Sequence, residues 1–375
     1  MTITQPAQRG PRESGAHFDD VSGQPLEQPV PWRPLKVAGE EIDAEIARLA
    51  EQPKPADGRR AALIVHPEST APGLGFSPAI DVTIEVLLPG ESTSPVRRNS
   101  GQVTIGIQGS GQVHVQGRDI ALAKWDVANI PSMKPYVYRN TGSGVWARLT
   151  YSNAPLLAKL GVGYAEPVSE FSAGSAPSAP SAVYNRDTAP DFEVSPFGSR
   201  LRGYEFLTDI EVVDSNAHHW PWSEVRKHLS TERGDGKRTI MAMYNPATER
   251  RNGANHSFFV TAFYSPAGGP PRQSERGHRH TSTAINYHFL GEGSSKVDGE
   301  VIEWKAGDLL LSAPGWREHR HTSGPNDVGV FTVQDHPLHI GMESLIWQED
   351  MEGPILTLGS EAGLTGYVGP REAGQ

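Results

Sequence analysis

The 375-residue chain contains no cysteine. Disulfide frameworks, cysteine-ligated zinc, iron–sulfur clusters and thiol nucleophiles are therefore all excluded. A metal ion in this protein would have to be held by histidine, aspartate or glutamate, and imidazole is the nitrogen ligand that remains. The 14 histidines are consequently the residues that would locate such a site.

Excess positive charge and long apolar runs are missing as well. The chain has 34 Lys and Arg against 44 Asp and Glu, a net charge of −10, so nothing favours binding to nucleic acid or to an anionic membrane. No apolar run approaches the ~20 residues of a membrane helix. The N-terminus also lacks the apolar core of a secretory signal. We expect a cytoplasmic protein whose partners are small molecules or proteins.

Hydrophobic periodicity indicates a mostly β chain with few short helices. Ile42, Ile46 and Leu49 recur at helical spacing and predict a helix over 40–51, whereas residues 80–88 alternate with period two, as in strands. A Ser/Ala/Pro-rich stretch at 172–182 is typical of a linker. The predicted divisions are 1–59 (arm and short helix), 60–165 (first β domain), 166–235 (linker and connection), 236–350 (second β domain) and 351–375 (tail).

The two β domains resemble each other, which indicates an internal duplication. Residues 101–131 align with residues 282–314. The matched positions are Gly109 with Gly291, Gly111 with Gly293, Asp126 with Asp308 and, after a one-residue shift, Pro131 with Pro314. One all-β unit is therefore present twice.

Only the second copy carries a histidine constellation. His278 and His280 are two residues apart, so they share one face of a strand, and Asn286 and His288 lie further along that face. His319 and His321 repeat this spacing after Pro314. The first copy has Val96-Arg97-Arg98 where the second has His278-Arg279-His280. Three neutral imidazoles could bind a metal and leave coordination positions open in the second copy alone.

At these residues the sequence resembles the cupins, and specifically a bicupin. The resemblance implies an all-β fold of two double-stranded β-helix (jelly-roll) barrels with a few short helices. His278, His280 and Gly291 match the first cupin motif, and Pro314 and His319 match the second, but Ala284 fills the slot of the usual glutamate ligand. A site of three histidines keeps the full +2 charge of the metal, which suits Fe(2+) binding an anionic substrate together with dioxygen.

Within the cupins the segments 278–285 and 316–321 are similar to the gentisate 1,2-dioxygenase group, which includes salicylate and hydroxynaphthoate ring-cleaving enzymes. This resemblance implies iron ligation by His278, His280 and His319, with His321 near substrate and O2. It also implies a homo-oligomer, dimer or tetramer. Members of the group usually carry the working ligands in the N-terminal cupin, and they commonly hold a carboxylate-binding arginine where this chain has Asn286. The expected substrate is a small aromatic acid of the gentisate or salicylate class, including 5-substituted salicylates such as 5-nitrosalicylate.

Further site residues follow as hypotheses. His321 and His288 are candidates for proton transfer, because histidine titrates near neutral pH. Asn286 and Arg317 are candidate substrate-binding residues, the arginine because a guanidinium pairs with a carboxylate in a two-pronged fork. Asp335, in the Asp-His-Pro-Leu turn, is a third candidate, with loop capping as its alternative role. Two other functions stay open: a non-oxidative metal-dependent cupin enzyme (isomerase, lyase or decarboxylase), and a non-catalytic binding bicupin.

Overall fold

The computed structural model describes residues 20–26, 28, 30–169, 191–203, 216–232, 239–267, 277–349 and 351–357. The predicted linker at 172–182 and the tail from residue 358 onward lie outside these residues. Met1–Val30 forms a unit of its own, and both β domains belong to the second unit, Pro31–Gln375. In the described part of the chain, no helix has the length and apolarity needed to cross a membrane.

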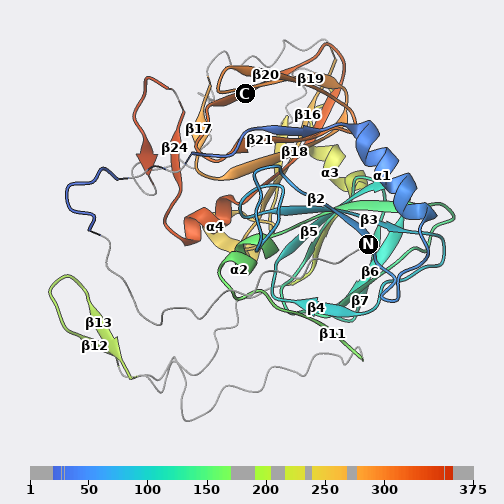
Figure 1. Ribbon diagram of the computed structural model, residues 1–375, viewed down its shortest axis with the longest axis horizontal. Helices are drawn as coiled ribbons and strands as arrows, with labels where there is room; N and C mark the ends of the chain where they lie inside the picture. Colours follow the sequence, from blue (N-terminus) through green and yellow to red (C-terminus); the bar gives the residue numbers. More distant parts are fainter. Residues whose placement is uncertain are drawn as a thin grey trace, which may run out of the picture. The chain divides into compact units, whose positions relative to one another are not determined.

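Two six-stranded antiparallel sheets, each backed by smaller sheets, form the body of the second unit (Figure 1). The first large sheet has the order β14-β8-β5-β10-β3-β2, and a smaller sheet has the order β11-β4-β9-β6-β7. Their strands are β2 (Arg60–Ile64), β3 (Asp81–Leu87), β4 (Val96–Arg98), β5 (Gln102–Gln108), β6 (Gly111–Val115), β7 (Arg118–Leu122), β8 (Val127–Ile130), β9 (Tyr136–Arg139), β10 (Trp146–Ser152), β11 (Ala165–Pro167) and β14 (His218–Trp220). We call this assembly the N-terminal barrel.

The C-terminal barrel repeats the plan. Its large sheet has the order β1-β21-β18-β23-β16-β15, and its smaller sheets are β20-β19-β22 and β17-β24-β25. Their strands are β1 (Leu35–Val37), β15 (Ile240–Met243), β16 (Phe259–Ser265), β17 (Arg279–His280), β18 (Thr283–Leu290), β19 (Glu292–Val297), β20 (Glu300–Lys305), β21 (Leu309–Pro314), β22 (His319–Ser323), β23 (Val328–Gln334), β24 (Ile346–Gln348) and β25 (Leu356–Thr357).

Helices are few and short. They are α1 (Gly39–Glu51), α2 (Ala154–Lys159), α3 (Trp222–Val225), α4 (His336–Gly341) and 3₁₀ turns at Arg226–His228 and Pro246–Arg251. A separate hairpin consists of β12 (Asp191–Glu193) and β13 (Arg200–Arg202). The predicted helix over 40–51 is confirmed by α1, whose Ile42, Ile46 and Leu49 are buried. The predicted all-β fold of two jelly-roll barrels is confirmed.

Strand register makes the duplication visible residue by residue. Tyr287 pairs with Leu309 as Ile105 pairs with Val127, which preserves the spacing found in the sequence. The one-residue shift in the sequence alignment is a β-bulge: the β18–β21 register slips between Ala284 and Ile285, with Ser312 as the extra residue. The bulge adds one residue to the C-terminal copy without changing the order of its strands.

The two barrels exchange strands. β1, at the beginning of the second unit, pairs with β21 of the C-terminal barrel, and β14, from the middle of the chain, pairs with β8 of the N-terminal barrel. After each exchanged strand a helix begins beside an aligned aspartate. Asp308 accepts the backbone N–H of Gly39 at 2.8 Å, and Asp126 accepts that of Trp222 at 2.8 Å. Each aspartate thus satisfies an otherwise unpaired amide at the first residue of a helix.

One hydrophobic core joins the two large sheets. Ile84, Ile105 and Leu149 of the N-terminal barrel belong to the same buried cluster as Ile285 and Phe331 of the C-terminal barrel. Each such side chain contributes about 1.5–3 kcal/mol by leaving water. Alternate residues of the same strands point into the barrel interiors, so strands such as β3 are buried on both faces. The interiors are therefore screened from water and can hold polar groups in defined positions.

Candidate metal centre

Two short strand segments bring three histidines together at the mouth of the C-terminal barrel. His278 and His319 form an isolated antiparallel bridge, with N–H to O distances of 3.1 and 2.8 Å in the two directions. His280 ends β17, and its ring centroid lies 4.8 Å from that of His319. One ligand atom from each of the three residues lies within 4.8 Å of the others. The three predicted ligands are thus within reach of one metal ion.

Backbone carbonyls fix the orientation of two of these rings. The Nδ1 atom of His280 lies 2.7 Å from the carbonyl oxygen of Ser282, and that of His319 lies 3.0 Å from the carbonyl of Arg317. A carbonyl only accepts, so each Nδ1 carries the proton and each Nε2 is left with a lone pair. Such hydrogen bonds are the usual way in which proteins orient metal-binding imidazoles.

Burial keeps the same two imidazoles neutral. It lowers the pKa of His280 well below the ordinary value, with smaller effects from the neighbouring His319 and His336. Burial also lowers the pKa of His319 to about 4. Neutral imidazole is the form that binds metals, so no proton needs to leave at neutral pH. Donor type, tautomer and protonation state all fit a divalent transition metal such as iron.

Two residues beside the cluster were not predicted from the sequence. Trp347 stacks on His278 with a centroid distance of 5.2 Å and on His280 with 4.6 Å. His336 lies 6.5 Å from Trp347, and its Nδ1 is buried without a hydrogen-bond partner. The sequence held a signal for His336: the aligned segments Asn-Ala-Pro-Leu and Asp-His-Pro-Leu differ by a histidine at this position. It held none for Trp347.

The two predicted proton-transfer residues are joined through a serine and a tryptophan. His321 is 5.8 Å from His319 between ring centroids, and its Nδ1 is 2.8 Å from Ser295 Oγ. Ser295 accepts the Nε1–H of Trp304 at 3.1 Å. Trp304 stacks on His288 at 3.9 Å, and both ring nitrogens of His288 are buried without a partner. His321 therefore lies closer to the metal cluster, and His288 at the far end of this row.

The three predicted substrate-binding residues have different surroundings. Asn286 is buried; its Nδ2 donates to Ser312 Oγ at 3.1 Å and its Oδ1 has no partner. Asp335 accepts the N–H of Thr283 at 2.6 Å, a contact that fixes the start of β18. Arg317 donates to the carbonyls of Trp32 and Pro31, at 2.7 and 2.6 Å, and pairs with Asp298. Asn286 alone among them presents an unused polar atom to the barrel interior.

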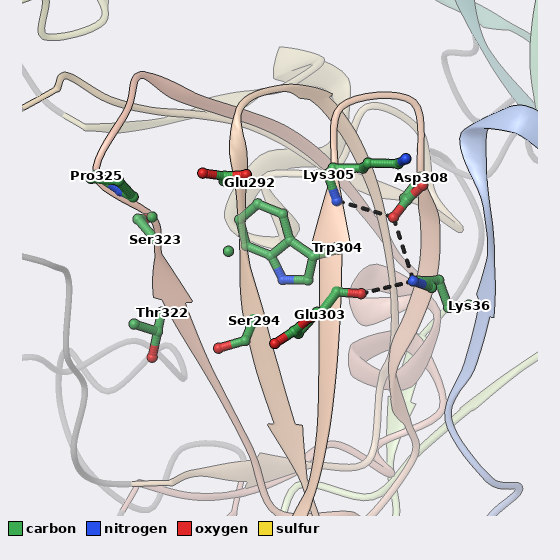
Figure 2. Close-up of a pocket in the computed structure, with 12 residues that line it drawn as sticks. Lys36, Glu292, Ser294, Glu303, Trp304, Lys305, Asp308, Thr322, Ser323 and Pro325 are labelled. Atoms are coloured by element: carbon green, nitrogen blue, oxygen red, sulfur yellow. Dashed lines mark hydrogen bonds and ion pairs between the residues drawn. The ribbon is translucent and has the colours of Figure 1, made fainter.

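A surface depression of about 500 Å³ lies over the small sheet β20-β19-β22 and is separate from the histidine cluster (Figure 2). Charged residues of both signs line it, among them Lys36, Glu292 and Glu303, but no histidine does. Thr322 and Ser323, at its edge, are three and four residues beyond His319, which corresponds to roughly 10 Å or more along the strand. Trp304 stands in the lining and separates the depression from the barrel interior.

The N-terminal barrel has other residues at the ligand positions. Val96 pairs with Tyr136 as His278 pairs with His319, so the bridge is retained without the histidines. By the same register Arg98 takes the place of His280, and Tyr138 that of His321. Val96 and Arg98 offer no atom that binds a metal cation, so two of the three ligand positions are lost in this barrel.

No family model matches the chain. The curated relatives include 1-hydroxy-2-naphthoate 1,2-dioxygenase of Nocardioides sp. (strain KP7), 24% identical over 344 residues that cover 88% of this chain and 81% of that protein. They also include 5-aminosalicylate 1,2-dioxygenase of Comamonas sp, 32% identical over 68 residues, or 18% of either chain. Only about a fifth of the aminosalicylate enzyme's length is therefore matched.

Among solved structures, salicylate 1,2-dioxygenase from Pseudaminobacter salicylatoxidans superposes with a TM-score of 0.67 and 15% identity, covering 87% of this chain and 90% of that one. This likeness confirms the fold. The paired barrels and the three-histidine cluster define a bicupin with a candidate metal centre. The proteins to which this bicupin is similar in sequence and in fold are ring-cleaving 1,2-dioxygenases of aromatic acids.

Proposed function

We propose that this bicupin is an Fe(II)-dependent ring-cleaving dioxygenase. It would act on a hydroxylated aromatic acid of the gentisate or salicylate class and insert both atoms of O2 between the carbons that bear the carboxyl and hydroxyl groups. The observation that carries the proposal is the cluster of His278, His280 and His319, with no carboxylate ligand because Ala284 fills the glutamate slot. The relatives named above act on substrates of this class, and adducts of the salicylate enzyme with gentisate have been solved.

In this proposal His278, His280 and His319 hold the iron, which supplies a Lewis-acid and redox centre where substrate and O2 meet. Three neutral ligands leave the metal's charge uncompensated, so an anionic substrate is favoured over a neutral one. Trp347, stacked on two ligand rings, restricts their rotation. Together with the carbonyls that hold His280 and His319, it preorganises the site.

The remaining residues divide into direct and indirect roles. His321 is proposed to exchange a proton with the substrate hydroxyl. Its ring neighbours that of His319 and its Nδ1 is held by Ser295, which supports this role. Asn286 and His336 offer unused buried polar atoms for the substrate. His288 stays a candidate for proton transfer through Trp304 and Ser295. Arg317 and Asp335 are proposed to support the site by anchoring residues 31–32 and the start of β18.

The decisive experiment loads the purified full-length chain with Fe(II) under anaerobic conditions. Gentisate, salicylate and 5-substituted salicylates are then offered with a measured amount of O2. We expect loss of aromatic absorbance with one O2 consumed per ring opened. Conversion of a substrate without O2 uptake would instead identify a non-oxidative cupin enzyme. Iron binding without turnover of any of these substrates would instead support a non-catalytic binding bicupin. A homo-oligomeric state and a cytoplasmic location are part of the proposal and are tested by light scattering and by cell fractionation.

A further inference from the structure

We propose that the interior of the N-terminal barrel is a second ligand site, one that binds a small organic carboxylate between Arg98 and Arg148. The inference does not depend on iron or on turnover in the other barrel. It rests on the charges, the unused hydrogen-bond donors and the aromatic rings that this barrel encloses.

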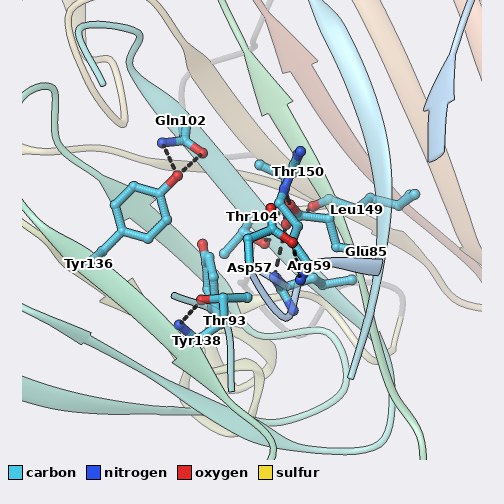
Figure 3. Close-up of polar contacts among 11 residues, drawn as sticks. Asp57, Arg59, Glu85, Thr93, Gln102, Thr104, Tyr136, Tyr138, Leu149 and Thr150 are labelled. Atoms are coloured by element: carbon cyan, nitrogen blue, oxygen red, sulfur yellow. Dashed lines mark hydrogen bonds and ion pairs between the residues drawn. The ribbon is translucent and has the colours of Figure 1, made fainter. Parts of the chain in front are cut away.

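The polar side chains inside this barrel are unbalanced in charge. Glu85 accepts from Arg59 Nε at 2.6 Å and from Thr150 Oγ1 at 2.9 Å (Figure 3). It also pairs with Arg148 Nη2 at 3.0 Å. Both carboxylate oxygens are thus in use. Within the described residues, Arg98 has no ion-pair partner. Three guanidinium groups therefore face two carboxyl groups, Glu85 and the nearby Asp81, which interacts with Arg98 and Arg59. One positive charge remains in excess at pH 7, and a buried excess of positive charge favours an anion.

Hydrogen-bond donors remain unused at the same place. Arg148 has 1% of its side chain exposed, yet its Nε and Nη1 have no partner. The Nε of Arg98 is likewise buried without a partner. A buried donor without a hydrogen-bond partner costs about 1–3 kcal/mol, and more when the group is charged. Several such donors close together are therefore rare in the core of a native protein. A carboxylate, which only accepts, is a matching occupant.

Aromatic rings surround these guanidinium groups. Arg148 lies over the Tyr138 ring at 3.7 Å and over the Trp146 ring at 4.8 Å, and Arg98 lies 6.0 Å from the Tyr136 ring centroid. Tyr136 is fixed by hydrogen bonds with Gln102 (Figure 3). Rings next to cationic donors suit a ligand with an apolar body and one carboxylate, rather than a bare inorganic anion.

The position of Arg98 strengthens the inference. It stands at the register position of His280, so the side chain that would hold a metal in one barrel is a guanidinium in the other. Arg59, with 35% of its side chain exposed, connects the buried charges with the surface. A duplicated barrel that has lost its metal ligands has thus kept an interior suited to an anionic ligand.

The test measures benzoate binding by calorimetry and by thermal shift in the full-length chain carrying His280→Ala. This substitution disrupts the candidate metal centre, so that benzoate cannot bind to a metal there. We expect one benzoate per chain, a concentration-dependent rise in Tm, and at least tenfold weaker binding after Arg98→Gln is added. The matched control is Arg97→Gln on the same strand, whose side chain is 43% exposed and pairs with Glu166. It should leave the affinity unchanged.

Several outcomes would overturn the proposal: no binding at millimolar benzoate, equal affinity for benzyl alcohol, full competition by chloride, or unchanged affinity in the Arg98→Gln chain. If that variant does not fold, Arg98→Lys keeps the charge but loses the planar fork. It should then bind benzoate more weakly than the parent. Failure of the dioxygenase assay would leave this result intact, because the binding assay contains no functional metal site.

Discussion

The two barrels share one strand order and one register, yet their interiors differ at the same positions. The C-terminal barrel places His278, His280 and His319 around a single point, whereas the N-terminal barrel places Val96, Arg98 and Tyr136 there. One interior is lined by imidazoles and the other by guanidinium and phenol groups. The shared backbone therefore sets where side chains meet, and the side chains at those positions set the chemical character of each interior.

The largest expected effect comes from removing one imidazole of the C-terminal cluster. His280→Ala should abolish metal binding and the ring cleavage proposed above, because two histidines hold a divalent ion far more weakly than three. Metal content per chain and O2 consumption measure this. His114→Ala, at a histidine that pairs with Asp119 on the outside of the N-terminal barrel, is the control and should change neither. If the His280→Ala chain still bound iron, the assignment of His280 as a metal ligand would be wrong.

The second-largest effect is a loss of stability when a buried arginine of the N-terminal barrel is removed. Arg148→Met leaves Glu85 buried with only Arg59 for an ionic partner. Burial by itself would raise the pKa of Glu85, but the two guanidinium groups outweigh it and hold this pKa at about 2. We expect a loss of about 3–5 kcal/mol in the free energy of unfolding, measured by urea titration at pH 7. Arg97→Gln should cost less than about 1 kcal/mol, as surface pairs do.

The exchanged strands offer a comparison in which the two barrels should behave alike. Asp308→Ala and Asp126→Ala each remove two backbone hydrogen bonds, one to a helix start and one to the preceding turn. Each should destabilise the chain by about 2 kcal/mol in chemical denaturation. Asp43→Ala, on the helix that follows β1, serves as a control. A cost confined to one aspartate would show that the exchange matters in only one barrel.

The smallest effect is a stabilisation that depends on pH. Burial raises the pKa of Asp81 in the N-terminal barrel from 3.8 to about 6, against the opposing influence of Ser152 and Arg98. The unfolded chain loses this proton first, so stability falls as pH rises from about 4 to 6, and the cost is complete above pH 6. Asp81→Asn should therefore raise the unfolding free energy by about 1–3 kcal/mol at pH 7 and by little at pH 4. Equal gains at both values would contradict this account.

Much of the architecture could be predicted because its signals lie within short stretches of the sequence. Period-two strands, the helix ended before Pro53, and the paired glycines and aspartates of the two copies all appear within short windows. The H-x-H spacing predicts a shared face because alternate strand residues point the same way. The exchange of β1 and β14 has no such signal, because a three-residue strand is too short for its sequence to indicate which strand it pairs with.

For the candidate site, the amino-acid sequence by itself determined which residue types are available: no cysteine, three histidines at strand spacing, and one copy that lacks them. Only the tertiary structure decided their surroundings. Trp347, on the strand paired with β17, contacts two of the candidate ligand rings, and Arg317 is held by the carbonyls of residues 31 and 32. Spacing along a strand fixes the direction of a side chain, but its contacts depend on segments that are far away in the sequence and meet only when the barrel closes.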